Sequence, residues 1–208
     1  VPPTITLLTP IGLFNTSSST LTFTFNTTDN DYQGMVCFIN ISQGDALQQS
    51  IGPLNITPSQ AHSNVSSSLS SGTYSWSVNC TDYSGNFQQS SANTLTVDII
   101  APTFVDGTLS NNSDAPLTGT VLRVGINVSE NLFNISAVRL FINVSGATDN
   151  EVNITRDIPN NTSVNLSYFL SSSLVGKLLN VTFEANDTLG NKRISSSLVL
   201  RVSAISLF

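Results

Sequence analysis

Asparagine is the residue type whose spacing in this chain points most directly to chemistry. Of the 23 asparagines, 16 stand two positions before a serine or threonine with no proline between, whereas the 55 serines and threonines among 208 residues would place about six there by chance. This spacing is the acceptor signal for N-linked glycosylation, in which a sugar is joined to the side-chain amide. The predicted sites are Asn15, Asn26, Asn40, Asn55, Asn64, Asn79, Asn111, Asn127, Asn134, Asn143, Asn153, Asn160, Asn161, Asn165, Asn180 and Asn186.

The two cysteines point to the same cellular compartment. Cys37 and Cys80 are the only cysteines, so they can form one bridge within the chain, with two buried free thiols as the alternative. Disulfides persist in oxidising compartments. Together with the glycosylation signals, they predict an extracellular or cell-surface protein from which a signal peptide has been removed, with covalent N-linked glycans as its only attached groups.

The remaining polar residues give no catalytic or metal-ligating pattern, so the sequence predicts no enzyme activity, no cofactor and no metal ion. His62 is the only histidine, and no serine is distinguished as a nucleophile for it to activate. Glu130, Glu151 and Glu184 stand singly, without a second carboxylate for glycoside hydrolysis. The stretch DNDYQG at 29–34 starts like a calcium loop but lacks the later glutamate, so an ordinary Asx turn is the preferred interpretation.

The chain carries few charges, and most of them are negative. Only 10% of the residues are charged and the formal net charge is −6, whereas binding to nucleic-acid phosphates needs a clustered basic face. No apolar run approaches the roughly 18 residues of a membrane helix. We therefore expect no nucleic-acid partner and no membrane span in the mature chain, and we expect sugars to hydrate this weakly charged surface.

Three pairs of similar segments recur at offsets that drift from 101 to 105 residues, which indicates a tandem repeat with small loop insertions. The pairs are TFNTTDN with GINVSEN, FIN with FIN, and NCTDYSGN with EANDTLGN. The joint lies in VDIIAPTF, where Pro102 marks a boundary. The sequence therefore predicts two domains, residues 1–101 with one disulfide and residues 102–208 without one.

Short runs of alternating apolar and polar residues, separated by Gly, Asn, Asp and Ser, predict β-strands throughout. This pattern favours an all-β protein of two tandem Ig-like antiparallel β-sandwich domains. Asn26, Asn79 and Asn180 fall on the polar face of their predicted strands, where a glycan can be accommodated. Asp82 and Asp187, each followed by x-x-Gly-Asn, are predicted to lie in turns between late strands.

The second copy has Leu140 in the place of Cys37 and Ala185 in the place of Cys80. A large and a small apolar residue would then fill, between the two sheets, the volume that the bridge occupies in the first copy. Phe38 and Phe141 share the outward phase of the neighbouring asparagines. Each of these rings is expected to lie beneath a sugar or a crossing loop, or to contact another subunit.

The first copy resembles the Ig-like repeats of archaeal cell-surface and secreted proteins, on the segments PPTITLLTP, TLTFTFNTTDND, VCFIN, SGTYSWSVNCTDYSGN and TLTVDIIAPTF. The cysteines and NCTD-x-x-GN are its most specific elements, and the second copy matches more loosely. The chain departs from immunoglobulin domains proper, whose corner tyrosine lies two residues before the second cysteine, because Val78 stands there. The resemblance implies structural and adhesive parts of envelopes, S-layers and extracellular filaments.

The favoured function is a structural subunit of a heavily N-glycosylated extracellular filament, similar in style to archaeal pilus-like threads, whose partners are copies of itself. Such subunits can assemble end to end by β-strand addition. The donor-strand candidates are Ala204, Ile205, Leu207 and Phe208 at one end, and Ile5 and Leu7 at the other, although the latter can also belong to the first strand of their own domain.

Two other functions compete with the filament. The chain can be a module of a larger adhesin or S-layer protein, with a cell-surface or other adhesion target. A carbohydrate-binding module or an accessory domain of a secreted enzyme is less favoured, because Trp76 falls on the inward phase of its strand and no row of exposed aromatic residues is evident.

Overall fold

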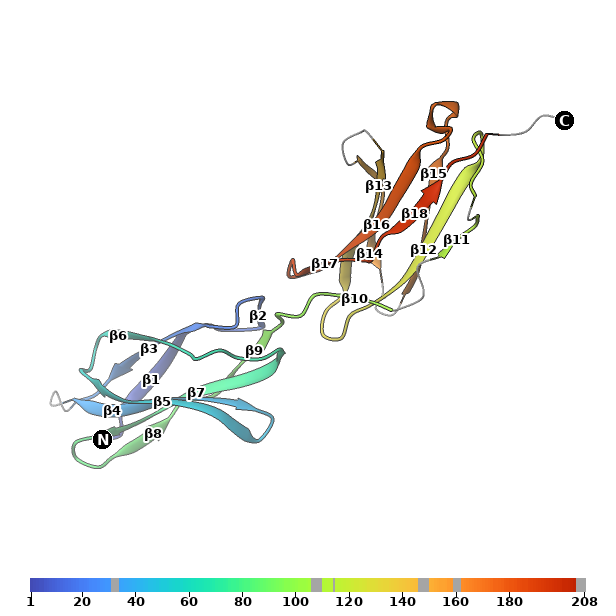
Figure 1. The fold of residues 1–208 in the computed structure, drawn as a ribbon. Helices are drawn as coiled ribbons and strands as arrows, with labels where there is room; N and C mark the ends of the chain where they lie inside the picture. Colours follow the sequence, from blue (N-terminus) through green and yellow to red (C-terminus); the bar gives the residue numbers. More distant parts are fainter. Residues whose placement is uncertain (31–33, 106–109, 114, 146–149, 159–161, 205–208) are drawn as a thin grey trace. The chain divides into compact units, whose positions relative to one another are not determined.

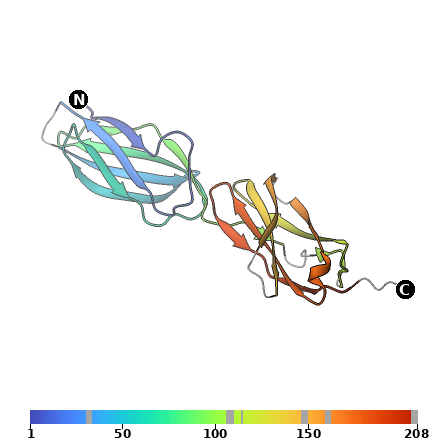
Figure 2. The same cartoon turned by 90° about the horizontal axis from the view of Figure 1, so that it is seen from above.

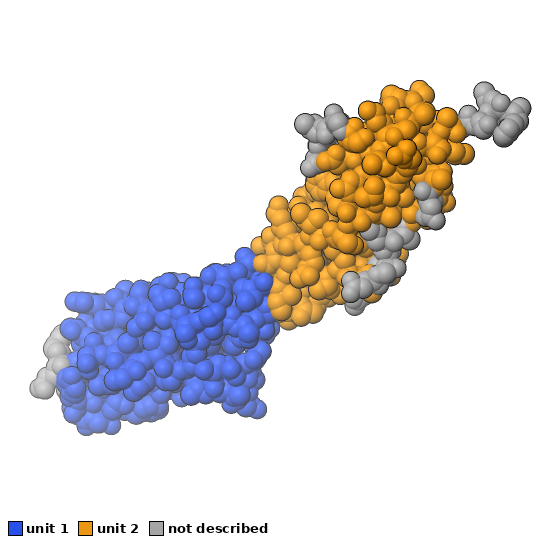
Figure 3. Space-filling model, in the orientation of Figure 1, with its two compact units in different colours: residues 1–99 blue, residues 100–208 orange. Residues whose placement is uncertain are grey.

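The computed structural model describes residues 1–30, 34–105, 110–113, 115–145, 150–158 and 162–204. The chain divides into two compact units, unit 1 (Val1–Ile99) and unit 2 (Ile100–Phe208), which Figure 3 shows in different colours. The division falls two residues before the boundary expected from the sequence. Within the described residues, no helix combines the length and the hydrophobicity that crossing a membrane requires.

Unit 1 is a sandwich of two sheets (Figure 1). One sheet has the order β1-β3-β6, and the other has the order β2-β9-β7-β4-β5 with β8 paired to β7. All pairings are antiparallel except that of β2 with β9. The strands are β1 (Thr4–Thr9), β2 (Phe14–Thr16), β3 (Thr22–Thr28), β4 (Met35–Gln43), β5 (Ala46–Ile56), β6 (Ala61–Val65), β7 (Gly72–Asp82), β8 (Phe87–Gln89) and β9 (Asn93–Val97).

Unit 2 has a similar topology, but its short strand β11 pairs with β12, whereas the short strand β2 of unit 1 pairs with β9 in the other sheet (Figures 1 and 2). One sheet joins β12 to β10, β11 and β15, and the other has the order β14-β13-β16-β17 with β18 paired to β16. The elements are β10 (Thr103–Phe104), β11 (Ser110–Asn111), β12 (Val121–Ser129), β13 (Ile135–Val144), β14 (Asn150–Ile158), β15 (Thr162–Phe169), the short 3-10 helix η1 (Ser172–Leu174), β16 (Leu178–Asp187), β17 (Lys192–Ile194) and β18 (Leu198–Arg201). The chain is therefore all-β, with two tandem Ig-like sandwiches.

Alternating side chains build each core, as the sequence predicts. In β3, Phe23 and Phe25 are fully buried while the residues beside them reach the surface or its margin. The rings of Trp76 and Phe23 pack edge to face, with their centroids 5.0 Å apart. The indole N–H of Trp76 donates a hydrogen bond of 2.9 Å to the carbonyl oxygen of Pro10. Burial of these rings removes large apolar areas from water, which is the main force that holds the two sheets together.

The same hairpin turn closes the corresponding strands of both units, and this confirms the turn predicted from D-x-x-G-N. In unit 1, the carboxylate of Asp82 accepts hydrogen bonds from the backbone amide and the side-chain Nδ2 of Asn86, at 2.8 and 2.7 Å. In unit 2, Asp187 accepts the equivalent bonds from Asn191, at 2.9 and 2.6 Å. The glycine before each asparagine has φ of 86° or 89°, a left-handed conformation that favours glycine.

The disulfide lies within one sheet, and the expectation that it joins the two sheets is wrong. Cys37 in β4 and Cys80 in β7 are directly opposite each other in the antiparallel ladder, with 4.1 Å between their Cα atoms and an S–S bond of 2.02 Å. Both residues are buried. The bridge therefore fixes the pairing of two neighbouring central strands, whereas the two sheets are held together mainly by apolar packing.

The residues that take the place of the cysteines in unit 2 also differ from the sequence alignment. Ala185 lies opposite Val138, while Leu140 lies opposite Phe183. Val138 therefore occupies the place of Cys37, because β13 has a one-residue bulge between Ile135 and Ala137. The two FIN segments are two residues out of structural register. Such a shift leaves every side chain on the same face, so sequence similarity could not detect it.

This register predicts that Val138→Cys/Ala185→Cys will form a disulfide in unit 2. Directly opposed residues lie within the Cα separation that a disulfide requires, whereas the diagonal pair in Leu140→Cys/Ala185→Cys lies at about 7–8 Å. By the chain-entropy model the new bridge should raise the free energy of unfolding by about 4 kcal/mol. Thiol counting by mass spectrometry and thermal unfolding test this. Efficient bridging in the diagonal variant alone would show that the register is wrong.

Candidate functional site

The predicted glycosylation sites lie at the surface of both units. The side chains of 13 of the 16 asparagines are described, and none of these 13 is buried. Asn153, Asn160 and Asn161 lie outside the residues whose side chains are described. The exposed members are Asn15, Asn55, Asn134, Asn165 and Asn180, and the partly exposed members are Asn26, Asn40, Asn64, Asn79, Asn111, Asn127, Asn143 and Asn186.

Four asparagines on central strands point away from the cores, as the alternation predicts. Asn26, Asn40, Asn79 and Asn180 each stand between two buried residues of the same strand. Because successive side chains of a strand point to opposite faces, these four amides lie on the outer faces of their sheets. The buried neighbours are Phe25, Thr27, Ile39, Ile41, Val78, Cys80, Leu179 and Val181.

Two asparagines on edge strands lie on the core-facing side instead. Asn64 in β6 is directly opposite the fully buried Phe23, and its side-chain oxygen accepts a hydrogen bond of 2.8 Å from the amide of Val65. Asn111 in β11 is opposite the buried Val124. Directly opposed residues share a face of the sheet, so these two sites differ from the outward ones in a way that the sequence signal does not reveal.

On the outer face of unit 2, two predicted glycosylation sites are immediate neighbours. Asn143 in β13 and Asn180 in β16 are directly opposite each other. Their Cβ atoms are therefore expected to lie about 4.5–5.5 Å apart. Phe141 lies on the same face, two residues before Asn143, and it is half-buried, which agrees with its predicted outward phase. In unit 1, Phe38 has the same relation to Asn40.

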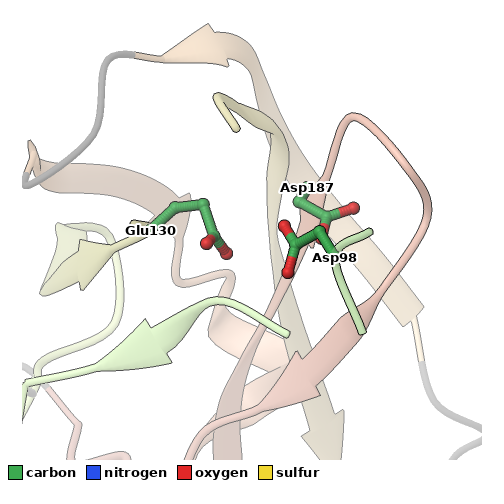
Figure 4. A group of neighbouring side chains, drawn as sticks. All are labelled: Asp98, Glu130 and Asp187. Carbon is green, nitrogen blue, oxygen red and sulfur yellow. The ribbon is translucent and has the colours of Figure 1, made fainter. Parts of the chain in front are cut away.

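Glu130 is not isolated in the structure, in contrast to its place in the sequence. Within unit 2 its carboxylate lies within 4.8 Å of that of Asp187 (Figure 4). Each carboxylate accepts hydrogen bonds from the backbone of its own loop. Glu130 Oε1 accepts one of 2.6 Å from the amide N–H of Asn131, and Asp187 Oδ1 accepts one each from the amide N–H groups of Leu189 and Asn191. The pair therefore has a structural role in shaping two adjacent loops. No alternation or spacing links residues 130 and 187, so sequence analysis missed it.

The other titratable residues considered in the sequence also have structural partners. Glu184 forms an ion pair of 2.8 Å with Arg139, on the outer face of unit 2. His62 packs against the ring of Phe25 and its Nε2 lies 3.1 Å from the carbonyl oxygen of Thr57. The side chain of Glu151, and residues 31–33 of the stretch that starts like a calcium loop, lie outside the described part of the chain.

The two groups of donor-strand candidates differ. Ile5 and Leu7 lie in β1, which pairs with β3 of the same unit, and both side chains pack against the core of unit 1. The structure therefore shows the alternative for this segment, the first strand of its own domain. At the other end Ala204 is exposed, whereas Ile205, Leu207 and Phe208 lie outside the described residues.

Comparisons with known proteins agree with the Ig-like fold. A family model described as a bacterial Ig-like domain matches residues 14–99, within unit 1. No curated protein sequence matches the chain. The sandwich architecture of both units is shared by many cell-surface domains that have no sequence similarity to one another.

Several solved structures are similar to this chain. They include fibronectin(III)-like modules of CbhA from Clostridium thermocellum (15% identity, TM-score 0.43, 99% of this chain and 98% of that chain) and the FN1–FN3 domains of chicken CNTN1 (13%, 0.43, 97% and 68%). The ICAM-5 D1–D4 ectodomain fragment is 10% identical, with a TM-score of 0.50 over 99% of this chain and 52% of that chain. Identities this low support the fold alone.

The Asp82 turn should make the stability of unit 1 depend on pH. The side-chain amide of Asn86, together with backbone amides, holds the pKa of Asp82 below its usual value of 3.8. The ionised form therefore stabilises the fold above that pH, and this contribution is lost as the pH falls through the lowered pKa. We expect Asp82→Asn, whose amide would face the Nδ2 of Asn86, to lower Tm at pH 7 and to differ less from the parent below pH 3.8.

The exposed Asp45, in the turn between β4 and β5 of the same unit, offers a control because it is not followed by the x-x-Gly-Asn of the Asp82 turn. Thermal unfolding of Asp45→Asn should follow the parent at every pH. A constant Tm difference between Asp82→Asn and the parent from pH 7 to pH 2 would contradict the role given to the charge.

The facing pair on unit 2 predicts that Asn143 and Asn180 seldom both carry glycans on one molecule, because two sugar chains attached to directly opposed residues would compete for the same space above the sheet. We expect Asn143→Gln to raise the glycan occupancy of Asn180 severalfold, measured on intact glycopeptides. Asn165→Gln, on the other sheet of unit 2, should leave that occupancy unchanged. Full occupancy of both sites in the parent protein would contradict this prediction.

Proposed function

We propose that this chain is a structural subunit of an N-glycosylated extracellular filament. The observation that carries the proposal is the position of the predicted sites, since none of the 13 described asparagines is buried and those on central strands lie on outer sheet faces. With 10% charged residues, the surface depends on neutral hydroxyl and amide groups for its hydration, and attached sugars would add many more hydroxyl groups. The bridge between Cys37 and Cys80 supports an oxidising compartment.

The glycans are assigned a protective and solubilising role. Exposed apolar side chains occur on both units, including Phe87 in unit 1 and Phe169 in unit 2, at 56% and 60% exposure. Exposed apolar groups and strand edges invite uncontrolled association. Sugars on the sheet faces would leave the terminal segments of the chain as the places where a regular contact between subunits can form.

The C-terminal segment is the proposed donor strand. Ser203 continues the last strand of unit 2 by donating its amide hydrogen to the carbonyl oxygen of Pro116, as Asp98 does to Thr16 in unit 1. Residues 204–208 then follow at the position where the first copy leads into its neighbour. In a polymer, this apolar segment would add to a sheet edge of the next subunit.

An Ig-like module of a larger adhesin or S-layer protein is the second candidate. The match of unit 1 to a bacterial Ig-like family supports it, because tandem Ig-like modules are common in cell-surface proteins. In that case residues 204–208 would be a linker to a further domain. The two candidates share extracellular location and glycosylation, and they differ in whether identical subunits polymerise.

Removal of Ala204–Phe208 is expected to abolish filament formation if this segment is the donor. Negative-stain electron microscopy of the glycosylated protein should show long uniform fibres for the parent and isolated molecules for the deletion. Deletion of the exposed Val1–Pro2, which precede β1, serves as the control and should leave the fibres intact. Isolated molecules in the parent preparation would contradict polymerisation and leave the adhesin module as the better account.

A further inference from the structure

We infer that Phe141 forms the base of a binding site for the first sugar of the glycan on Asn143, so that this glycan is part of the folded surface of unit 2. The inference rests on the glycosylation included in the proposed function. It goes further by naming the groove, the sugar that fills it and the aromatic ring that holds the sugar.

The groove lies on the outer face of the β13–β16–β17 sheet and has a volume of about 390 Å³. It is lined by Phe141, Asn143, Asn180, Thr182, Glu184 and Ile194. A volume in this range is enough for a small ligand. Asn143, to which the sugar would be joined, is therefore part of the groove's wall. The covalent bond keeps the first sugar beside the groove, so even a weak interaction with the ring would hold the sugar in place.

The strand geometry brings the ring and the amide together. Phe141 and Asn143 are two residues apart in β13, so their side chains point to the same side of the sheet. Phe141 is opposite Thr182 in β16. The ring is only half-buried, although it lies in the middle of a five-stranded sheet. An aromatic ring at this position leaves apolar area in contact with water unless something covers it.

A pyranose ring matches this surface chemically. One of its faces carries C–H groups and packs on an aromatic face, while its hydroxyl groups remain free to bond with polar neighbours. Glu184 and Thr182 at the margin of the groove offer a carboxylate and a hydroxyl for such bonds. The apolar base and polar margin resemble those of small-ligand sites in general.

Unit 1 also has a phenylalanine two residues before an outward asparagine, although this phenylalanine is not at the position that corresponds to Phe141 in the strand pairing. Phe38 is half-buried on the outer face of β4, opposite Asn79 and two residues before Asn40. The hydroxyl of Ser50 donates a hydrogen bond of 2.9 Å to Oδ1 of Asn40, which fixes the amide plane and leaves Nδ2 for the sugar bond. Both sandwiches thus place a phenylalanine beside an outward glycosylation site, even though strand pairing does not make the two phenylalanines equivalent.

The test measures coupling between the ring and the glycan. All proteins are produced in a host that glycosylates the chain, and all carry Asn180→Gln so that only the glycan on Asn143 varies. Phe141→Ser is combined with Asn143 or with Asn143→Gln, and Tm is measured for the four proteins. We expect Phe141→Ser to lower Tm by about 2–4 °C more when the glycan is present than when it is absent.

Phe169→Ser is the matched control, because Phe169 is an exposed phenylalanine in β15, on the other sheet of unit 2. Its effect on Tm should be the same with and without the glycan. Equal shifts for Phe141→Ser, with Asn143 shown to be glycosylated, would overturn this inference and leave the proposed function intact. An unmodified Asn143 in the parent would overturn the inference and also remove support for glycosylation of this face.

Discussion

The alternation of inward and outward side chains along each strand is the constraint on which the rest of this structure depends. Every central strand gives one face to an apolar core, so only the other face can meet water. That face has unusually few charges, because 10% charged residues must serve two complete sandwiches. The glycosylation signals on the outward positions fit this need. The two-residue alternation of side chains along the strands thus determines which residues enter the apolar cores and which are accessible for glycosylation.

The two units solve the same packing problem by different means. Unit 1 joins β4 to β7 covalently through Cys37 and Cys80, and unit 2 holds the corresponding strands by hydrogen bonds and by Val138 against Ala185. The Asp turn at the end of these strands is kept in both units. A disulfide between neighbouring strands protects their register, and it does not tie the sheets together. Unit 1 is therefore expected to keep its central pairing under conditions that open unit 2.

Sequence patterns predicted the fold class, the tandem repeat, the turns of Asp82 and Asp187 and the outward phase of several asparagines, because each depends on local periodicity. They did not predict features that depend on which strands pair. Asn64 has a perfect glycosylation signal, yet its position opposite Phe23 places it on the core-facing side. The two FIN segments differ in structural register by two residues, a shift that preserves the faces, and the proximity of Asn143 to Asn180 depends on the pairing of β13 with β16.

Site-resolved mass spectrometry of intact glycopeptides from the native protein tests the central claim most directly. The account predicts glycans on outward positions of both units, among them Asn40 in unit 1 and at least one of Asn143 and Asn180 in unit 2, and an unmodified Asn64. Unmodified asparagines on the outward faces, together with a glycan on Asn64, would contradict it. Glycosylation would then not follow the outward positions of the strands.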